Sequence, residues 1–146
     1  MTRWTWIIWP VLALLVFGCR VTGPEGSAPE VVSAWARPAS RDGNGAVFLV
    51  VRNPGSEADR LTGADADVAM AVELHETMND GGVMRMRPRP EGFELPARGE
   101  LQLAPGGKHI MLMGLTRDLA LGDTFTVTLK FARAGEIPVR VVMKRP

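Results

Sequence analysis

From residue 31 onward, the chain is a series of short apolar or alternating stretches, each followed by a turn. Asn, Asp, Pro and Gly gather between the stretches, as in RDGNG, NPG, NDGG and APGG. No stretch holds a helical period, apart from a single turn near 65–71. Nine short strands of this kind predict an all-β sandwich or barrel. We place them at 31–37, 46–53, 70–76, 83–88, 92–96, 100–104, 109–115, 124–132 and 137–144.

The clearest of these strands is TFTVTLKF at 124–131. Its apolar residues alternate strictly with threonine and lysine. Successive side chains of a strand point to opposite faces of the sheet, so one face of this strand is predicted to join the core and the other to meet solvent. The core residues are then Phe125, Val127, Leu129 and Phe131.

The first 18 residues have a different character. Arg3 is followed by the uncharged run WTWIIWPVLALLVFG and then by Cys19, the only cysteine of the chain. A basic start and an apolar middle are typical of a signal peptide, and VFGC is similar to the lipobox of bacterial lipoproteins. A membrane span is the alternative, but the run is shorter than the roughly 20 residues that a bilayer requires, and it contains Pro10.

These features predict three regions. They are a lipoprotein signal peptide at 1–18, a flexible Gly-, Pro- and Ser-rich tether at 19–30, and one domain at 31–146. Lipidation of Cys19 would hold the domain on the periplasmic side of a bacterial membrane. The residue after Cys19 is Arg20. An aspartate at this position would favour retention in the inner membrane, so the usual sorting rule weakly favours the outer membrane.

Charge and cysteine content exclude several kinds of partner and site. Without residues 1–18 the chain has 16 basic and 16 acidic residues, and this balance argues against a nucleic-acid partner. If Cys19 carries a lipid, no free thiol remains for a disulfide or a thiolate metal site. The serines form no nucleophile-elbow pattern, so we expect no enzyme.

Both histidines lie in predicted strands, and both are predicted to point away from the core. Strand alternation puts His109 on the same side as Met111 and Met113, opposite Ile110, and it puts His75 on the side opposite the core of its own strand. Neighbouring positions on one side of a strand are about 6 to 7 Å apart at the backbone. An imidazole and a thioether at that spacing can bind one ion.

Methionines are concentrated around these histidines. Five of them lie between residues 78 and 113: Met78, Met84, Met86, Met111 and Met113. Methionine is also a common core filler, so packing remains the alternative explanation for each of them. The clustering nevertheless exceeds what filling gaps in a core requires.

The order and spacing of four of these residues resemble a known family. His75, Met86, His109 and Met111 are similar to the H-x10-M-x21-H-x-M signature of the periplasmic CuA chaperone family (PCuAC), with one extra residue in the longer gap. The surrounding stretches VELHETM, GVMRMRP, LAPGGKHIMLMGL and LGDTFTVTLKF also resemble the family, in family order. The resemblance extends from Val31 to Met143.

This resemblance implies a cupredoxin-like fold and a Cu(I) site built from those four ligands. Thioethers favour Cu(I) over zinc, calcium and magnesium, and imidazole suits copper. The four ligands are neutral, which we interpret as favouring release as well as binding. Met78, expected on a turn, together with Met84 and Met113, is a candidate for a second shell or a transient landing site, with packing as the alternative.

The implied function is a copper chaperone that delivers copper to the CuA subunit of cytochrome c oxidase, beside other copper-assembly factors. A blue-copper electron carrier is excluded because it requires a cysteine ligand. Two alternatives stay open. One is a copper-buffering lipoprotein with the same site, and the other is a structural β-sandwich lipoprotein whose Met and His residues only pack.

Overall fold

The computed structural model describes residues 27–145, which form ten β-strands and, within that range, no helix. The strands are β1 (Glu30–Ala36), β2 (Gly45–Arg52), β3 (Asp59–Ala66), β4 (Ala69–Asp80), β5 (Val83–Pro88), β6 (Phe93–Leu95), β7 (Glu100–Leu103), β8 (Lys108–Leu115), β9 (Thr124–Phe131) and β10 (Gly135–Met143). The all-β prediction is confirmed. The signal peptide, Cys19 and most of the tether lie outside the described residues.

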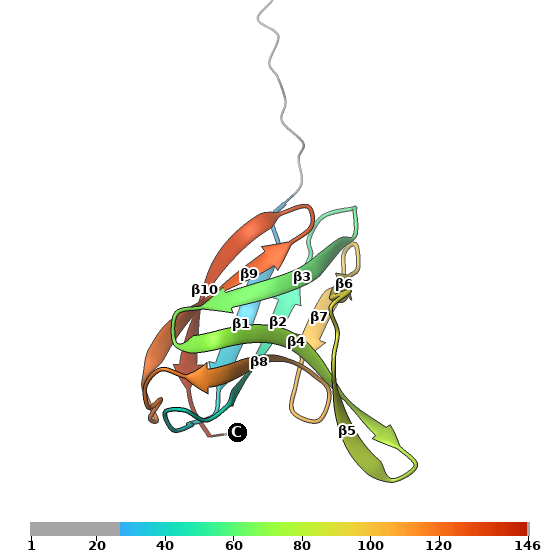
Figure 1. Ribbon diagram of the computed structural model, residues 1–146. Coiled ribbons are helices and arrows are strands. Elements are labelled where there is room, and N and C mark those ends of the chain that lie inside the picture. Colours follow the sequence, from blue (N-terminus) through green and yellow to red (C-terminus); the bar gives the residue numbers. More distant parts are fainter. Residues whose placement is uncertain (1–26, 146) are drawn as a thin grey trace, which may run out of the picture.

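The strands form one continuous sheet that curls into a barrel-like sandwich (Figure 1). Their order is β5-β4-β8-β2-β1-β10-β9-β3-β6, and only β1 and β10 pair in parallel. On one side of β2, the first residues pair with β8 and the later ones with β7. Strand β2 therefore connects the part of the sheet that carries β4 and β5 to the rest of the barrel.

The core follows the alternation predicted from the sequence. In β9 all four predicted residues are buried, and in β8 Ile110 and Leu112 are fully buried. Leu74 of β4 lies on the same inner face. Each fully buried side chain of this size contributes about 1.5–3 kcal/mol of hydrophobic free energy, so the inner side of β4 and β8 is firmly anchored. Their outer side is therefore held in a fixed position.

One strand was missed by the prediction. Strand β3, Asp59–Ala66, occupies a region assigned to no strand, and no helical turn forms near 65–71. Its sequence, DRLTGADA, contains two Asp and one Gly, residue types that are depleted in strands. A bulge between Leu61 and Gly63 also breaks the two-residue alternation. Pairing with β9 and β6 on its two sides overrides these weak local preferences.

Strand β4 is longer than the predicted 70–76. It continues to Asp80 and pairs with the whole of β5, so Met78 lies in a strand and not on a turn. Gly81 and Gly82 form the connection, both with positive φ, 61° and 91°. A two-residue loop with positive φ at both positions matches the twist of an antiparallel hairpin.

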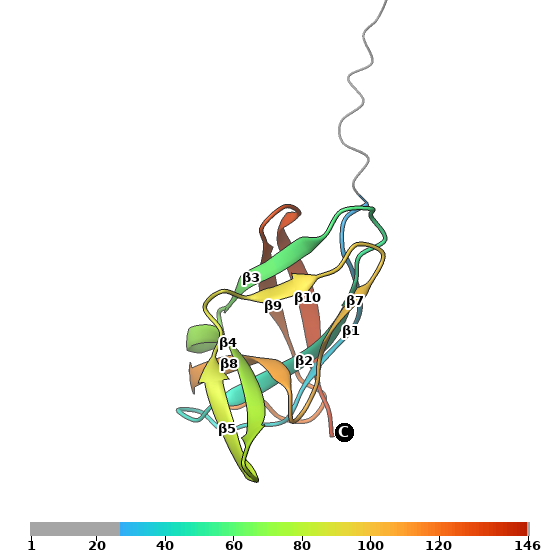
Figure 2. The same cartoon turned by 90° about the vertical axis from the view of Figure 1, so that its right-hand side faces the viewer.

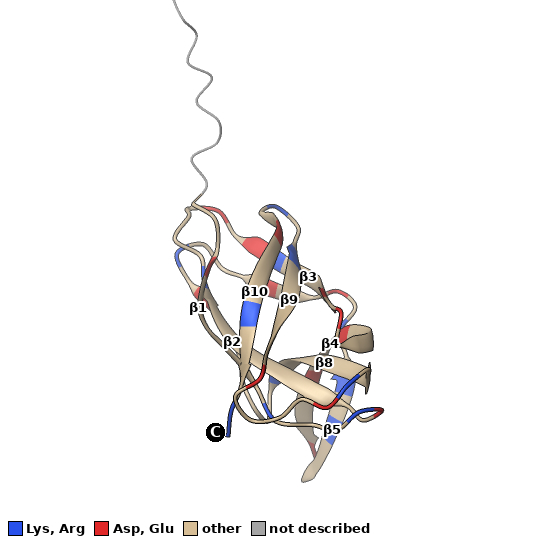
Figure 3. Ribbon diagram, turned by 90° about the vertical axis from the view of Figure 1, so that its left-hand side faces the viewer, with Lys and Arg blue, Asp and Glu red and all other residues tan. Residues whose placement is uncertain are grey.

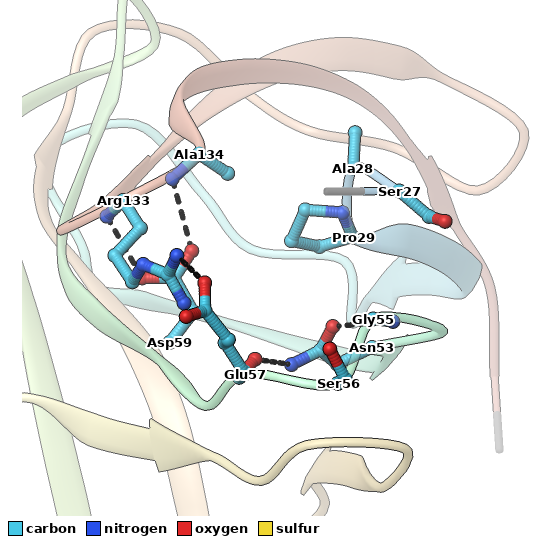
Figure 4. A pocket seen from close by; sticks show the side chains of 10 residues that line it. All are labelled: Ser27, Ala28, Pro29, Asn53, Gly55, Ser56, Glu57, Asp59, Arg133 and Ala134. Carbon is cyan, nitrogen blue, oxygen red and sulfur yellow. Dashed lines mark hydrogen bonds and ion pairs between the residues drawn. The ribbon is translucent and has the colours of Figure 1, made fainter. Parts of the chain in front are cut away.

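The N-terminal end of the described chain and the β4–β5 hairpin lie at opposite ends of the barrel (Figures 1 and 2). At the N-terminal end, Ser27, Ala28 and Pro29 line a pocket with Asp59 and Arg133 (Figure 4). Pro29 is buried, so the last residues of the predicted tether pack against the domain.

The Asp59 carboxylate organises this end of the barrel. It accepts hydrogen bonds from the backbone N–H groups of Arg133 and Ala134, at 2.9 and 3.0 Å. The Arg133 side chain forms an ion pair with Glu57 (Figure 4). The polar groups drawn in the pocket are therefore largely paired with one another.

Charged residues of both signs are interspersed over the strands and loops (Figure 3). This mixture agrees with the balanced charge of the sequence. Within residues 27–145, no helix is long and apolar enough to cross a membrane.

Candidate metal centre

Three adjacent strands, β5, β4 and β8, bring the predicted ligands to one face of the sheet. His75 of β4 lies directly opposite His109 of β8, and Thr77 of β4 lies opposite Met86 of β5. Directly opposed residues of an antiparallel pair share a face. Met111 follows His109 by two residues on β8, so all four predicted ligands lie on the outer face that backs onto the buried Leu74 and Ile110 layer.

The two imidazoles form the centre of this arrangement. Their ring centroids are 5.9 Å apart, with planes inclined at 58°. The His109 residue is 3% exposed, and the His75 side chain is 13% exposed. Both rings are therefore largely removed from water although they lie on the outer face of the sheet.

Each imidazole uses one nitrogen for orientation and leaves the other without a hydrogen bond. His109 Nδ1 lies 3.0 Å from the carbonyl oxygen of Gly107, and His75 Nε2 lies 2.9 Å from a carboxylate oxygen of Glu73. Carbonyl and carboxylate oxygens only accept, so these two nitrogens carry the protons. In the neutral rings, lone pairs are then left on His75 Nδ1 and His109 Nε2.

Those two lone-pair nitrogens are both buried, and neither has a hydrogen-bond partner within the described part of the chain. A buried polar atom without a partner is costly and calls for an explanation. A metal ion supplies one, because ligating histidines generally donate their other N–H to a carboxylate or a backbone carbonyl. Both histidines show this arrangement.

The ring separation also fits a shared ion. Imidazole nitrogens bind first-row metal ions at about 2 Å, and the ring centre lies roughly 1 Å further back, so two such rings have centres about 5 to 6 Å apart. In residues 27–145 no group of three or more His, Cys, Asp and Glu side chains is placed to hold a metal. The thioethers on the same face are the remaining soft donors.

The methionines differ in exposure and in face. Met86 is 50% exposed and Met84 57% exposed, whereas Met111 and Met113 are half-buried. Met84 lies opposite Asn79 and shares the face of the histidines. Met78 lies opposite Arg85, and alternation places it on the other face of the hairpin. The structure therefore brings Met84 and Met113 to the face of the histidines and separates Met78 from it.

Aromatic residues of β1 and β2 cover the far side of His109. The ring centroid of Phe48 is 6.4 Å from that of His109, and the ring of Trp35 lies 4.8 Å beyond Phe48. Phe48 is only 4% exposed. The Phe48 ring therefore contributes to the burial of His109.

Ion pairs stabilise the base of the β4–β5 hairpin. Arg89, just after β5, forms ion pairs with Glu76 at 2.7 Å and with Glu91 at 2.5 Å, and its backbone N–H donates to the carbonyl of Leu74. A backbone hydrogen bond, together with the nearby guanidinium of Arg89, lowers the pKa of the Glu91 carboxyl. The hairpin is thus fixed at its base, next to His75.

Glu73 is a residue of this site that the sequence analysis did not single out. Its carboxylate orients His75, and it lies directly opposite Met111. The E-x-H spacing, which puts both side chains on one face of a strand, was the available signal. The four predicted ligands are neutral, but one of them, His75, is hydrogen-bonded to a negatively charged carboxylate.

Comparisons with known proteins agree with this architecture. The family model described as "Putative lipoprotein LpqE-like" matches residues 30–143. The chain belongs to this LpqE-like family of PCuAC-type proteins. The resemblance predicted from the sequence is confirmed. "Putative lipoprotein Lxx21020" of Leifsonia xyli subsp. xyli is 39% identical over 122 residues, which cover 84% of this chain and 73% of that protein.

Solved structures show the same fold. The copper-bound PCuAC domain from PmoF2 is 22% identical, with a TM-score of 0.68 over 83% of this chain and 96% of that domain. The Cu(I) form of DR1885 from Deinococcus radiodurans is 30% identical, with a TM-score of 0.61, and the match covers 84% of this chain and 83% of DR1885. The cupredoxin-like prediction is confirmed, with ten strands in the described residues where about nine were expected.

Proposed function

We propose that this protein binds Cu(I) with His75, Met86, His109 and Met111 and acts as an extracytoplasmic copper chaperone. The observation that carries the proposal is the pair of buried, unpartnered imidazole nitrogens, His75 Nδ1 and His109 Nε2. They lie on directly opposed residues, and thioethers flank them on the same face.

The donor set favours Cu(I) over other ions. Two thioethers are poor ligands for zinc and for hard cations, whereas Cu(I) binds thioethers and imidazoles well. Thioethers also require no deprotonation, so a site of this kind works where thiols are oxidised. The similarity to the Cu(I) form of DR1885 supports the same assignment.

Unequal exposure of the ligands supports a role in transfer. His109 is buried, whereas half of Met86 is exposed to solvent. A neutral, exposed thioether is the ligand that an incoming donor can displace most easily. An acceptor could thus attack the copper from the β5 side while the histidines still hold it, which is how ligand exchange hands over a metal ion without releasing it to water.

For the biological setting, we propose cleavage after residue 18, lipidation of Cys19 and residence on the periplasmic side, with the outer membrane weakly favoured. The tether would raise the local concentration of the domain beside membrane-bound partners. The proposed client is the CuA subunit of cytochrome c oxidase, reached directly or through other copper-assembly factors.

Competition for Cu(I) with a colorimetric chelator tests the site. The soluble domain should bind one Cu(I), and His109→Ala should lose most of the affinity. A second variant, Met86→Leu, removes a proposed thioether ligand. Its matched control is Met70→Leu, because Met70 is 84% exposed on the same sheet and is not a proposed ligand. Equal affinity in the wild type and His109→Ala would refute the assignment.

X-ray absorption of the Cu(I)-loaded domain gives an independent test. A first shell that mixes nitrogen and sulfur supports the proposed ligands, whereas a shell of nitrogen and oxygen alone contradicts them. If Cu(I) also fails to raise the unfolding temperature, the protein is a structural lipoprotein, because a ligand that binds only the folded state must stabilise it.

Burial of both lone-pair nitrogens favours retention of the ion, so copper buffering is the second candidate function. A deletion strain separates the two candidates. Loss of oxidase activity at low copper indicates delivery, whereas loss of copper tolerance alone indicates buffering.

A further inference from the structure

The outer part of the β4–β5 hairpin extends beyond the main sheet. Strand β4 pairs with β8 as far as Glu76, and the N–H of Thr77 still donates to the carbonyl of Gly107. From there to Asp80, β4 pairs only with β5. Figures 1 and 2 both show a two-stranded ribbon that projects from the barrel at the end far from residue 27.

Packing does not account for the methionines of this ribbon. Met78, Met84 and Met86 are 45%, 57% and 50% exposed. A methionine that fills a gap in a core is buried, and exposed apolar residues gathered on one element generally mark a functional surface. About half of the surface of each of these residues is therefore in contact with solvent.

Met84 and Met86 form a row with the proposed copper site, and Met78 does not. Met86 and Met84 lie two residues apart on one face of β5, opposite Thr77 and Asn79. Positions of this kind are about 7 Å apart at the backbone, a gap that two long, flexible Met side chains can bridge. Met86 is the member next to His75, and Met84 is the outer member near the tip.

We propose that Met84 and Met86 together form an outer, transient Cu(I)-binding site through which copper enters and leaves the histidine pair. The proposal rests on the proposed function and adds a second position for the same ion. Cu(I) is bound there by two thioethers, which are ligands suited to its softness. The site takes Cu(I) from a donor or gives it to an acceptor at the exposed end of the face.

Transfer along this row requires only exchange of ligands. On entry, a Cu–S bond to Met84 and then to Met86 forms as each donor ligand leaves. Bonds to His75 Nδ1, to His109 Nε2 and to the Met111 sulfur then form while the bond to Met84 breaks, and Met86 stays bound. The copper stays Cu(I) throughout, and no electron or proton is transferred, because both nitrogens already present lone pairs.

The end of this face at Met113 is less exposed to solvent than the end at Met84. Met113 follows Met111 by two residues on β8, and both are half-buried. Met113 lies opposite Ala71, within the part of β4 that pairs with β8, whereas Met84 lies on the projecting part of the hairpin. A partner protein therefore has better access to Met84 than to Met113, which makes the hairpin the exchange side.

Rates of Cu(I) transfer between the loaded domain and the chelator bicinchoninate, measured by stopped flow, test the proposal. The variant Met84→Leu removes the sulfur and keeps an apolar side chain of similar size. Transfer should slow about tenfold, equivalent to about 1.4 kcal/mol in the barrier, whereas the equilibrium affinity changes less than twofold. Met78→Leu is the matched control on the other face of the same ribbon, and its rate should be unchanged.

Two results would overturn the outer site. One is an equal rate for Met84→Leu and Met78→Leu, and the other is a loss of equilibrium affinity in Met84→Leu as large as that in Met86→Leu. These results leave the histidine site intact, because wild-type binding and the loss in His109→Ala are measured in the same series. Failure of the wild type to bind Cu(I) overturns both proposals.

Discussion

Replacing Glu73 with glutamine tests how His75 is prepared for a metal ion. The Glu73 carboxylate lies 2.9 Å from His75 Nε2, and the Glu73 side chain is 50% exposed. Glutamine keeps an oxygen acceptor and removes the charge. Loss of such an outer partner typically weakens metal binding 10- to 100-fold. Because solvent screens a half-exposed carboxylate, we expect the lower end, about tenfold, or ~1.4 kcal/mol.

Two measurements should give this value independently. Competition with a Cu(I) chelator should show a dissociation constant about tenfold higher for Glu73→Gln. In denaturant unfolding at fixed free Cu(I) well above that constant, the stabilisation by copper should fall by about 1.4 kcal/mol. Without copper, the variant should differ from the wild type by less than about 1 kcal/mol, because the pair is exposed on one side.

The matched control is Glu100→Gln. Glu100 is 49% exposed and accepts a charged hydrogen bond from Arg52, also at 2.9 Å, but it lies on β7, away from the histidines. This variant should bind Cu(I) like the wild type. The reasoning is refuted if Glu73→Gln binds within twofold of the wild type, or if Glu100→Gln weakens binding equally.

Two further predictions concern the fold. Gly92 has a φ of +74°, and a Cβ there would overlap a backbone carbonyl oxygen of β3, so Gly92→Ala should lower the free energy of unfolding by about 3 kcal/mol or more. Gly106→Ala, at φ +80° but in open space, should cost only about 1 kcal/mol. Asp59→Ala should cost about 3 kcal/mol in urea unfolding, because it leaves the N–H groups of Arg133 and Ala134 unpaired.

Each of these has an outcome that contradicts it. Similar losses for the two glycine variants would show that backbone strain, and not the overlap with β3, limits residue 92. A cost below about 1 kcal/mol for Asp59→Ala would show that water replaces the carboxylate at the exposed end of the barrel.

Much of the fold could be predicted because its strands alternate clearly. In β9, every second residue is large and apolar, so the local pattern and the final burial coincide. Strand β3 could not be predicted, because a bulge shifts its register after Leu61 and its Asp and Gly residues disfavour strands. Pairing with β9 on one side and β6 on the other, both distant in the sequence, stabilises it.

The candidate site, like the fold, could be predicted from the sequence only in part. Strand alternation placed His75, His109 and Met111 on outward-facing sides, and the register of β4 with β8 then put the two histidines directly opposite each other. That register depends on residues from both strands and is not encoded in either alone. Met78 was expected on a turn because the predicted strand ended at residue 76, whereas β4 continues to Asp80. Glu73 was not recognised, because its role in orienting His75 becomes evident only when His109 is seen to lie opposite His75.

The position of residue 27, at the end of the barrel far from the hairpin, determines what can be attached to the domain without blocking it. Whatever is joined there, whether a lipid, another domain or a sensor surface, is separated from the β4–β5 hairpin by the body of the barrel. The domain should therefore work as a portable module. An N-terminal fusion leaves the proposed copper site open to partners, whereas a cargo grafted into the Gly81–Gly82 turn would lie beside it.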